Sequence, residues 1–204
     1  MFGLTPKELR LLRSLNTPIK IQRFLDTLNY HENDTAWSPR KVLREGTAHC
    51  LEGSILAAAA FYVNGTTPLL VDHEAIRDTD HVLAVFQHRK HWGAVALSHY
   101  AGLRYREPVY RTLRELSMSY FDAYCNHSGD RTLRTYSRPL DIRRYDHLHW
   151  MTSEKNIWFI PEYFVHCHHT KLLKPWMEKL LVRVGNRNYA AQMVGTERFN
   201  KIKL

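Results

Sequence analysis

The sequence has few cysteines and no long apolar run, and both absences exclude classes of protein. Its three cysteines, Cys50, Cys125 and Cys167, are an odd number without paired spacing, which argues against a disulfide framework. No apolar run reaches the roughly 20 residues that cross a bilayer, so we expect no membrane partner. The charged N-terminal stretch also lacks the apolar core of an export signal. The sequence therefore predicts a cytoplasmic protein with reduced thiols.

Acidic residues are in the minority: 20 Asp and Glu stand against 29 Lys and Arg, for a formal net charge of +9. This excess favours an anionic partner, such as nucleic acid, an acidic protein or a phosphorylated metabolite. The basic residues are spread out, and no run reaches the roughly five to eight consecutive charges of a basic tail. Solvated arginine side chains are therefore the alternative explanation. The sequence leaves the oligomeric state open.

The chain length and the order of the patterns predict the domain organisation. We expect one domain over residues 1–204, because this length suits a single core. A core segment spans residues 36–125, and residues 126–204 form a C-terminal extension that completes the sheet. The predicted class is α+β: a cysteine-bearing helix packs on an antiparallel β-sheet and is preceded by short N-terminal helices.

The central segment carries the clearest patterns. Gly46 and the cap residue Thr47 predict a helix that has Cys50 in its first turn. Small residues along this helix would allow a sheet to approach closely; they are Gly53, Ser54, Ala57 and Ala60. The apolar stretches 80–87 and 91–98 flank a polar turn and predict a hairpin.

The later segments give three further predictions. Apolar residues at helical spacing predict a helix over residues 106–124. Residues 157–165 are rich in aromatic and β-branched side chains, so they predict a strand or strand pair interrupted by Pro161. Residues 175–185 predict a helix that ends at Gly185.

Cys50 and His81 form the candidate catalytic pair. A thiol in the first turn of a helix lies near free N–H groups and the positive end of the helix dipole, which favour the thiolate. Nucleophilic thiols also need a base and a group that orients it. Strand alternation puts His81 on the face of Leu83 and Val85, which we expect to pack toward the helix. Hairpin pairing then points to Ser98 or His99 as the orienting group.

These segments resemble the transglutaminase-like superfamily of papain-like cysteine enzymes, specifically a bacterial branch of short members. The resemblance is carried by GTAHCLEGSILAAAAFYVNG, PLLVDHEAI, DHVLAVF, HWGAVALS and GLRYREPVYRTLRELSMSY. It implies that Cys50 is the nucleophile and His81 the base. The superfamily has an aspartate at the third position, where this chain has Ser98 followed by His99. Three explanations of this difference are open: another polar group replaces the aspartate, the His81 ring is only weakly oriented, or the activity is lost.

The resemblance implies a cysteine hydrolase or acyltransferase acting on a peptide, a protein or another amide or ester substrate. The thiolate attacks the carbonyl, the N–H of Cys50 helps to hold the oxyanion, and His81 protonates the leaving group. Water or an amine then accepts the acyl group, and the sequence does not choose between them. This chemistry requires no cofactor, and none is predicted.

Two residues near the hairpin are assigned to substrate binding. Trp92 is expected in the core or on the wall of the cleft. Arg104 belongs to a group of arginines suited to an anionic substrate, and structural ion pairs are the alternative for this group.

A histidine-rich stretch contains residue types that commonly bind metal ions, namely His166, Cys167, His168 and His169. Adjacent residues do not all point at one ion, although alternate residues of a strand share a face. A metal would need a further ligand from His147 or His149. With 13 histidines in the chain, such clusters arise by chance, so no metal site is predicted.

Non-catalytic explanations remain beside the enzymatic one. Cys50 in an alanine-rich helix also suits a small core residue, and His81 suits a core histidine bonded to a backbone carbonyl. The alternative function is a papain-like scaffold that binds nucleic acid or a protein partner. An accessory protein that acts through protein contacts is a third interpretation.

Overall fold

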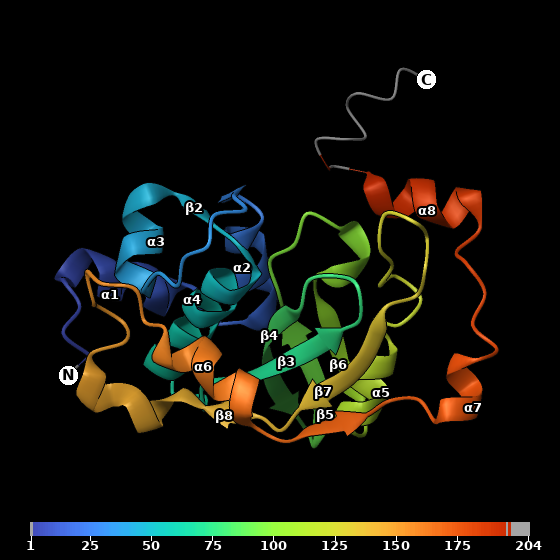
Figure 1. The fold of residues 1–204 in the computed structure, drawn as a ribbon. Helices are drawn as coiled ribbons and strands as arrows, with labels where there is room; N and C mark the ends of the chain where they lie inside the picture. The colour runs from blue at the N-terminus through green and yellow to red at the C-terminus, as the bar shows by residue number, and fades with distance from the viewer. Residues whose placement is uncertain (1, 195, 197–204) are drawn as a thin grey trace.

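The computed structural model describes residues 2–194 and 196 of the chain. It has the predicted α+β class, with helices on both sides of an antiparallel sheet (Figure 1). The helices are α1 (Pro6–Ser14), α2 (Pro18–Leu25), α3 (Pro39–Glu45), α4 (Cys50–Val63), α5 (Leu113–Met118), α6 (Phe159–His166), α7 (Pro175–Glu178) and α8 (Asn186–Met193), with 3₁₀ turns at Ala101–Leu103 and Ile142–Leu148.

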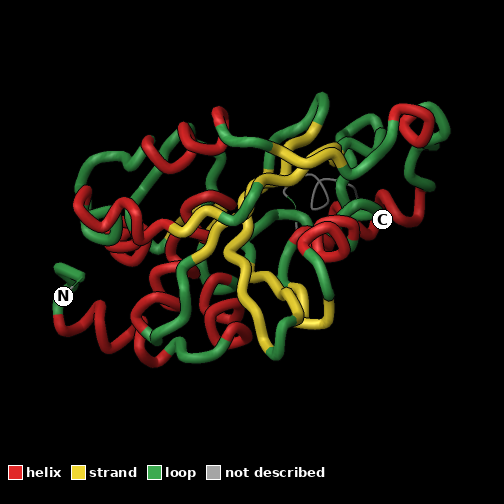
Figure 2. The backbone as a smooth tube through the Cα atoms, turned by 90° about the horizontal axis from the view of Figure 1, so that it is seen from below, coloured by secondary structure: helices red, strands yellow, loops and turns green. Residues whose placement is uncertain are grey.

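The main sheet has seven strands within the described residues, in the order β6-β5-β4-β3-β7-β9, with β8 also paired to β3. These strands are β3 (Leu69–Ala75), β4 (His81–His88), β5 (His91–Val95), β6 (Arg106–Tyr110), β7 (Leu133–Ser137), β8 (Leu140–Asp141) and β9 (His169–Lys171). A separate parallel pair joins β1 (Asn29–Tyr30) to β2 (Thr47–Ala48). The tube in Figure 2 shows the strands running between the two groups of helices.

Strand alternation divides the interior into two apolar cores. Val82 and Phe86 of β4 join the core of α1, α2 and α4, whereas Leu83 and Val85 join the core beneath α5. His81 has the same parity as Leu83, so its side chain belongs to the α5 face. The expectation that this face packs toward the cysteine-bearing helix is therefore wrong. Both faces are apolar because helices cover both, so alternation alone does not identify the face that meets α4.

The small residues of α4 permit the close approach that the sequence predicts. A Cβ atom added to Gly53 would lie 2.6 Å from the Cβ atom of Leu97. Ser54, the next residue, donates its hydroxyl to the carbonyl oxygen of Val82 at 2.7 Å. The start of α4 is thereby fixed against the start of β4, where His81 lies.

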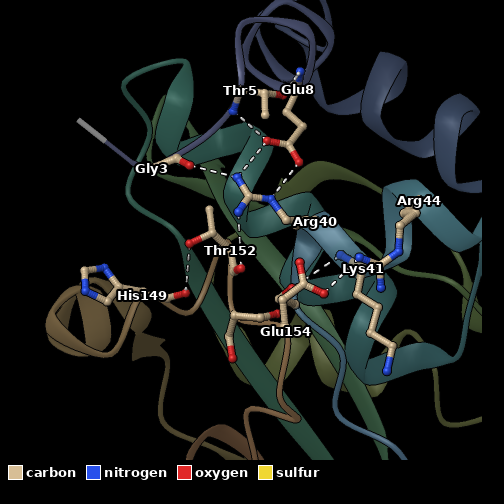
Figure 3. Close-up of polar contacts among 11 residues, drawn as sticks. Gly3, Thr5, Glu8, Arg40, Lys41, Arg44, His149, Thr152 and Glu154 are labelled. Atoms are coloured by element: carbon tan, nitrogen blue, oxygen red, sulfur yellow. Dashed lines mark hydrogen bonds and ion pairs between the residues drawn. The ribbon is translucent and has the colours of Figure 1, made fainter.

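Arg40 of α3 ties the N-terminal segment to the rest of the fold (Figure 3). Its Nε atom donates to Glu8 of α1 at 2.9 Å, and its guanidinium also reaches the carbonyl oxygens of Gly3 and Thr152. The hydrogen bond from Arg40 lowers the pKa of Glu8 to about 2. This cluster holds α1 against α3 and the loop before α6.

Three predicted elements differ from the observed ones. Residues 106–124 begin as the edge strand β6, where Pro108 is tolerated, and only α5 within this stretch is α-helical. Residues 157–165 lie mostly in α6 rather than in a strand, with Pro161 in the first helical turn, a position that needs no N–H. The helix predicted over residues 175–185 is limited to α7.

No helix among the described residues combines the length and the apolar character that a bilayer-spanning segment needs.

Candidate functional site

Cys50 opens α4 and lies on the wall of a cleft with a volume of about 670 Å³. The cleft is also lined by Tyr30, His31, Asp80 and Tyr100. A smaller cavity of about 30 Å³ adjoins it and shares Cys50 as a wall residue. This cavity has the space of roughly one or two water molecules. Cys50 is thus a partly exposed residue at the boundary between the cleft and the core.

The sulfur atom of Cys50 lies against the start of β4. Its Sγ atom is 3.9 Å from the carbonyl oxygen of Asp80. Burial raises the pKa of the Cys50 thiol, while the N–H groups of Val82 and Leu51 and the hydroxyl of Tyr30 act to lower it. Burial dominates, so the thiol is protonated at neutral pH. The expectation that the helix start stabilises a thiolate here is wrong, because the loss of solvation outweighs the nearby donors.

His81 shares the small cavity with Cys50 although its side chain belongs to the α5 face of the sheet. The residue is 4% exposed. Burial lowers the pKa of its imidazole to about 4. His81 is therefore a neutral imidazole at physiological pH and is able to accept a proton.

A main-chain carbonyl orients this imidazole. Nε2 of His81 lies 2.8 Å from the carbonyl oxygen of Leu103, and because a carbonyl only accepts, Nε2 carries the proton. Nδ1 is then the basic nitrogen. Leu103 ends the 3₁₀ turn that follows the hairpin, and sequence reasoning missed it because a backbone carbonyl has no residue-type signature.

Ser98 and His99 do not make this bond to Nε2. Ser98 lines the small cavity, and its hydroxyl accepts the N–H of Tyr100 at 3.1 Å. The His99 ring lies 3.6 Å from the ring of Tyr30, and its Nε2 atom is 3.5 Å from Glu32. The sequence predicts that Ser98 or His99 orients His81, but the group that contacts Nε2 is the Leu103 carbonyl.

The two predicted substrate-binding residues have other contacts. Arg104 donates two hydrogen bonds to the carbonyl oxygen of Ser98, at 2.9 and 2.7 Å, and forms an ion pair with Asp26. It therefore fixes the loop that carries Leu103. Trp92 pairs with Gln87 near the hairpin turn, at the end of β4 remote from His81, and packs against the α5 core. Neither side chain lines the cleft at Cys50.

Glu52 is a site residue that sequence reasoning missed. It lies in the first turn of α4 and its side chain is fully buried, with hydrogen bonds from Thr35 and Trp37. The capping-box signature combines Ser or Thr at the N-cap with Glu or Gln at the third helical position. Here the N-cap residue is His49, so the sequence carries only the glutamate half of that signature.

The histidine-rich segment joins the sheet through β9, which pairs with β7, and one of its histidines also forms an ion pair with a buried carboxylate. His169 of β9 places Nε2 3.1 Å from the carboxylate of buried Asp72 on β3. The hydrogen bond to Asp72 raises the pKa of His169. No group of three or more His, Cys, Asp or Glu side chains in the described part of the chain is arranged to hold a metal ion.

No family model matches the chain, and no curated protein matches it either.

Proposed function

We propose that the protein is a cysteine hydrolase or acyltransferase with Cys50 as nucleophile and His81 as base. The observation that carries this proposal is that Cys50 and His81 are both wall residues of one small cavity beside an open cleft. The Leu103 carbonyl supports it further, because it leaves the basic Nδ1 atom of His81 to accept a proton. A cysteine-bearing helix packed on an antiparallel sheet is also what the resemblance to papain-like, transglutaminase-like enzymes implies.

The reaction begins when the Cys50 sulfur attacks the carbonyl carbon of an amide or ester. The thiol proton passes to Nδ1 of His81 as the S–C bond forms, and the N–H groups of Leu51 and Val82 near the sulfur are available to the oxyanion. The C–N or C–O bond then breaks, and the imidazolium returns the proton to the leaving group. Water or an amine attacks the resulting thioester and regenerates the thiol.

The raised pKa of Cys50 and the lowered pKa of His81 define the resting state. Proton transfer from this thiol to this imidazole is uphill, so a thiolate–imidazolium pair does not accumulate. Deprotonation therefore accompanies the attack on the carbonyl, as general-base catalysis, which typically contributes about 10²- to 10⁴-fold.

Burst kinetics with p-nitrophenyl acetate test the proposal. We expect one equivalent of nitrophenolate to be released rapidly, and we expect the C50S variant to lose this burst. C167S is the matched control and should keep it, because Cys167 lines neither the cleft nor the small cavity. A burst that survives in C50S, or no burst in the wild-type protein, would contradict the assignment.

A second candidate function is a non-catalytic module that binds nucleic acid or a protein partner. The raised pKa of Cys50 favours it, because a protonated thiol has little nucleophilicity. The net charge of +9 adds an attraction for anions. Fluorescence anisotropy with labelled DNA and RNA 20-mers tests the nucleic-acid version. Binding that weakens steeply with salt supports it, and no binding at low salt contradicts it.

A further inference from the structure

Glu52 is a fully buried carboxylate at the third position of α4, in the same helical turn as Cys50. Its side chain has 0% exposure to solvent. A carboxylate removed from water is costly unless hydrogen-bond donors surround it. The helix start reduces this cost, since its N–H groups and dipole favour negative charge.

Donors from two segments meet this carboxylate. Oε1 of Glu52 accepts the Thr35 hydroxyl at 2.7 Å and the Trp37 N–H at 2.9 Å. Oε2 accepts the N–H of His49 at 3.3 Å and lies 2.9 Å from Nε2 of His31. Three of these four partners belong to residues 31–37, so the carboxylate fastens that segment to the start of α4.

Residues 31–37 form one wall of the Cys50 cleft. His31 and Thr35 line the cleft together with Cys50. A contact that does not involve Glu52 also holds the segment. The carbonyl oxygen of Ala36 accepts the N–H of Ile157 at 2.7 Å. Weakening the Glu52 contacts therefore leaves this second attachment in place.

We propose that Glu52 is a positioning residue that fixes residues 31–37 as the wall of the cleft and thereby limits the size of the group that reaches Cys50. The consequence for substrate size rests on the proposed function, whereas the fixing of the wall does not. Glutamine at this position keeps the volume and one oxygen. Its NH₂ group then faces two of the donors, so half of the contacts are lost.

The E52Q variant, compared with E115Q, tests the fixing of the wall. Glu115 occupies the same third position of α5, is exposed, and accepts the N–H of Arg111. We expect amide hydrogen exchange at Trp37 to become about 10-fold faster in E52Q and to stay unchanged in E115Q. Unchanged exchange at Trp37, or an equal acceleration of every core amide, would overturn the proposal.

Alkylation of Cys50 tests the limit on size. The ratio of the rate with fluorescein-5-maleimide to the rate with iodoacetamide should rise about 10-fold in E52Q, because the bulky reagent gains access. Cys167 is not among the residues that line the cleft or the small cavity, so it reports global opening and should keep its ratio. An unchanged ratio at Cys50 would refute the limit on size. If the wild-type protein gives no acyl-enzyme, the proposed function fails, and Trp37 exchange still decides the role of Glu52.

Discussion

The Nε2 atom of His81 donates a hydrogen bond to the main-chain carbonyl of Leu103 at 2.8 Å. This contact does what a carboxylate does in many cysteine enzymes: it fixes the imidazole tautomer and leaves Nδ1 basic. A carbonyl dipole stabilises an imidazolium less than a full negative charge does, which agrees with the lowered pKa of His81. With a histidine of this low basicity, the Cys50 proton is transferred to His81 while the sulfur attacks the carbonyl. A thiolate–imidazolium pair is not formed beforehand.

Buried neutral histidines should make the fold sensitive to acid. Burial lowers the pKa values of His73 and His81 to about 3 and about 4, from about 6.5 in the unfolded chain. The unfolded state therefore binds more protons as the pH falls below about 6.5, and stability is lost toward pH 4. Each histidine contributes a slope of about 1.4 kcal/mol per pH unit. Urea unfolding between these pH values should show this slope reduced in H73Q and in H81Q. A slope unaffected by both variants would contradict the burial of neutral rings.

Removing the Tyr30 hydroxyl should make the Cys50 thiol less acidic. This hydroxyl is among the groups that lower the thiol pKa, so Y30F should shift the pH profile of iodoacetamide alkylation at Cys50 to higher pH. Y189F is the control, because the Tyr189 hydroxyl bonds to the carbonyl of His127 instead. A profile for Y30F that coincides with the wild-type profile would show that the hydroxyl does not reach the sulfur.

A methyl group at Gly53 should separate α4 from the hairpin. The added Cβ would lie 2.6 Å from Leu97, whereas a Cβ at Gly185 would meet no heavy atom within 4 Å. We expect G53A to lower the free energy of unfolding by about 1–3 kcal/mol, the usual cost of overpacking. Chemical denaturation should show little change in G185A. Equal stability of the two variants would mean that α4 and Leu97 are not in tight contact.

The hairpin was predictable because two apolar stretches flank a polar turn, and the observed pairs run from His88–His91 to Ala84–Val95. The observed register pairs Gln87 with Trp92, and β5 ends at Val95, so Ser98 and His99 lie beyond the paired part of the hairpin. The face of β4 that meets α4 was not predictable, since both faces are apolar. Helices distant in sequence determine which face of β4 packs against α4. This packing determines the face of the sheet on which the His81 side chain lies.

Other parts of the site required three-dimensional information for different reasons. The carbonyl of Leu103 is a backbone group and leaves no mark on the sequence. Residues 157–165 have strand-like composition, yet tertiary packing of Ile160 and Phe164 against the α4 core selects a helix. The raised pKa of Cys50 follows from burial, which outweighs the local helix dipole.

The Asp72–His169 pair should hold β9 to β3 most strongly below neutral pH. His169 has a raised pKa because of its hydrogen bond to Asp72, so this stabilisation is fully present below about pH 6.5. It is lost as the pH rises through the folded-state pKa. In D72N, NMR titration of the His169 ring should give a lower pKa, while D122N should leave it unchanged. A pKa of His169 unaffected by D72N would exclude the ion pair.

Mass-spectrometric localisation of the acetyl group after reaction with p-nitrophenyl acetate decides whether Cys50 and His81 act as a catalytic pair. We expect a thioester on Cys50 that forms much faster than on Cys125 or Cys167, and we expect its rate of formation to fall about 100-fold or more in H81Q. H88Q, a change at an exposed hairpin histidine, should acylate at the wild-type rate. Acetylation of Cys50 at the same rate in H81Q as in the wild-type protein, or no faster than at the other two cysteines, would contradict a Cys50–His81 catalytic pair.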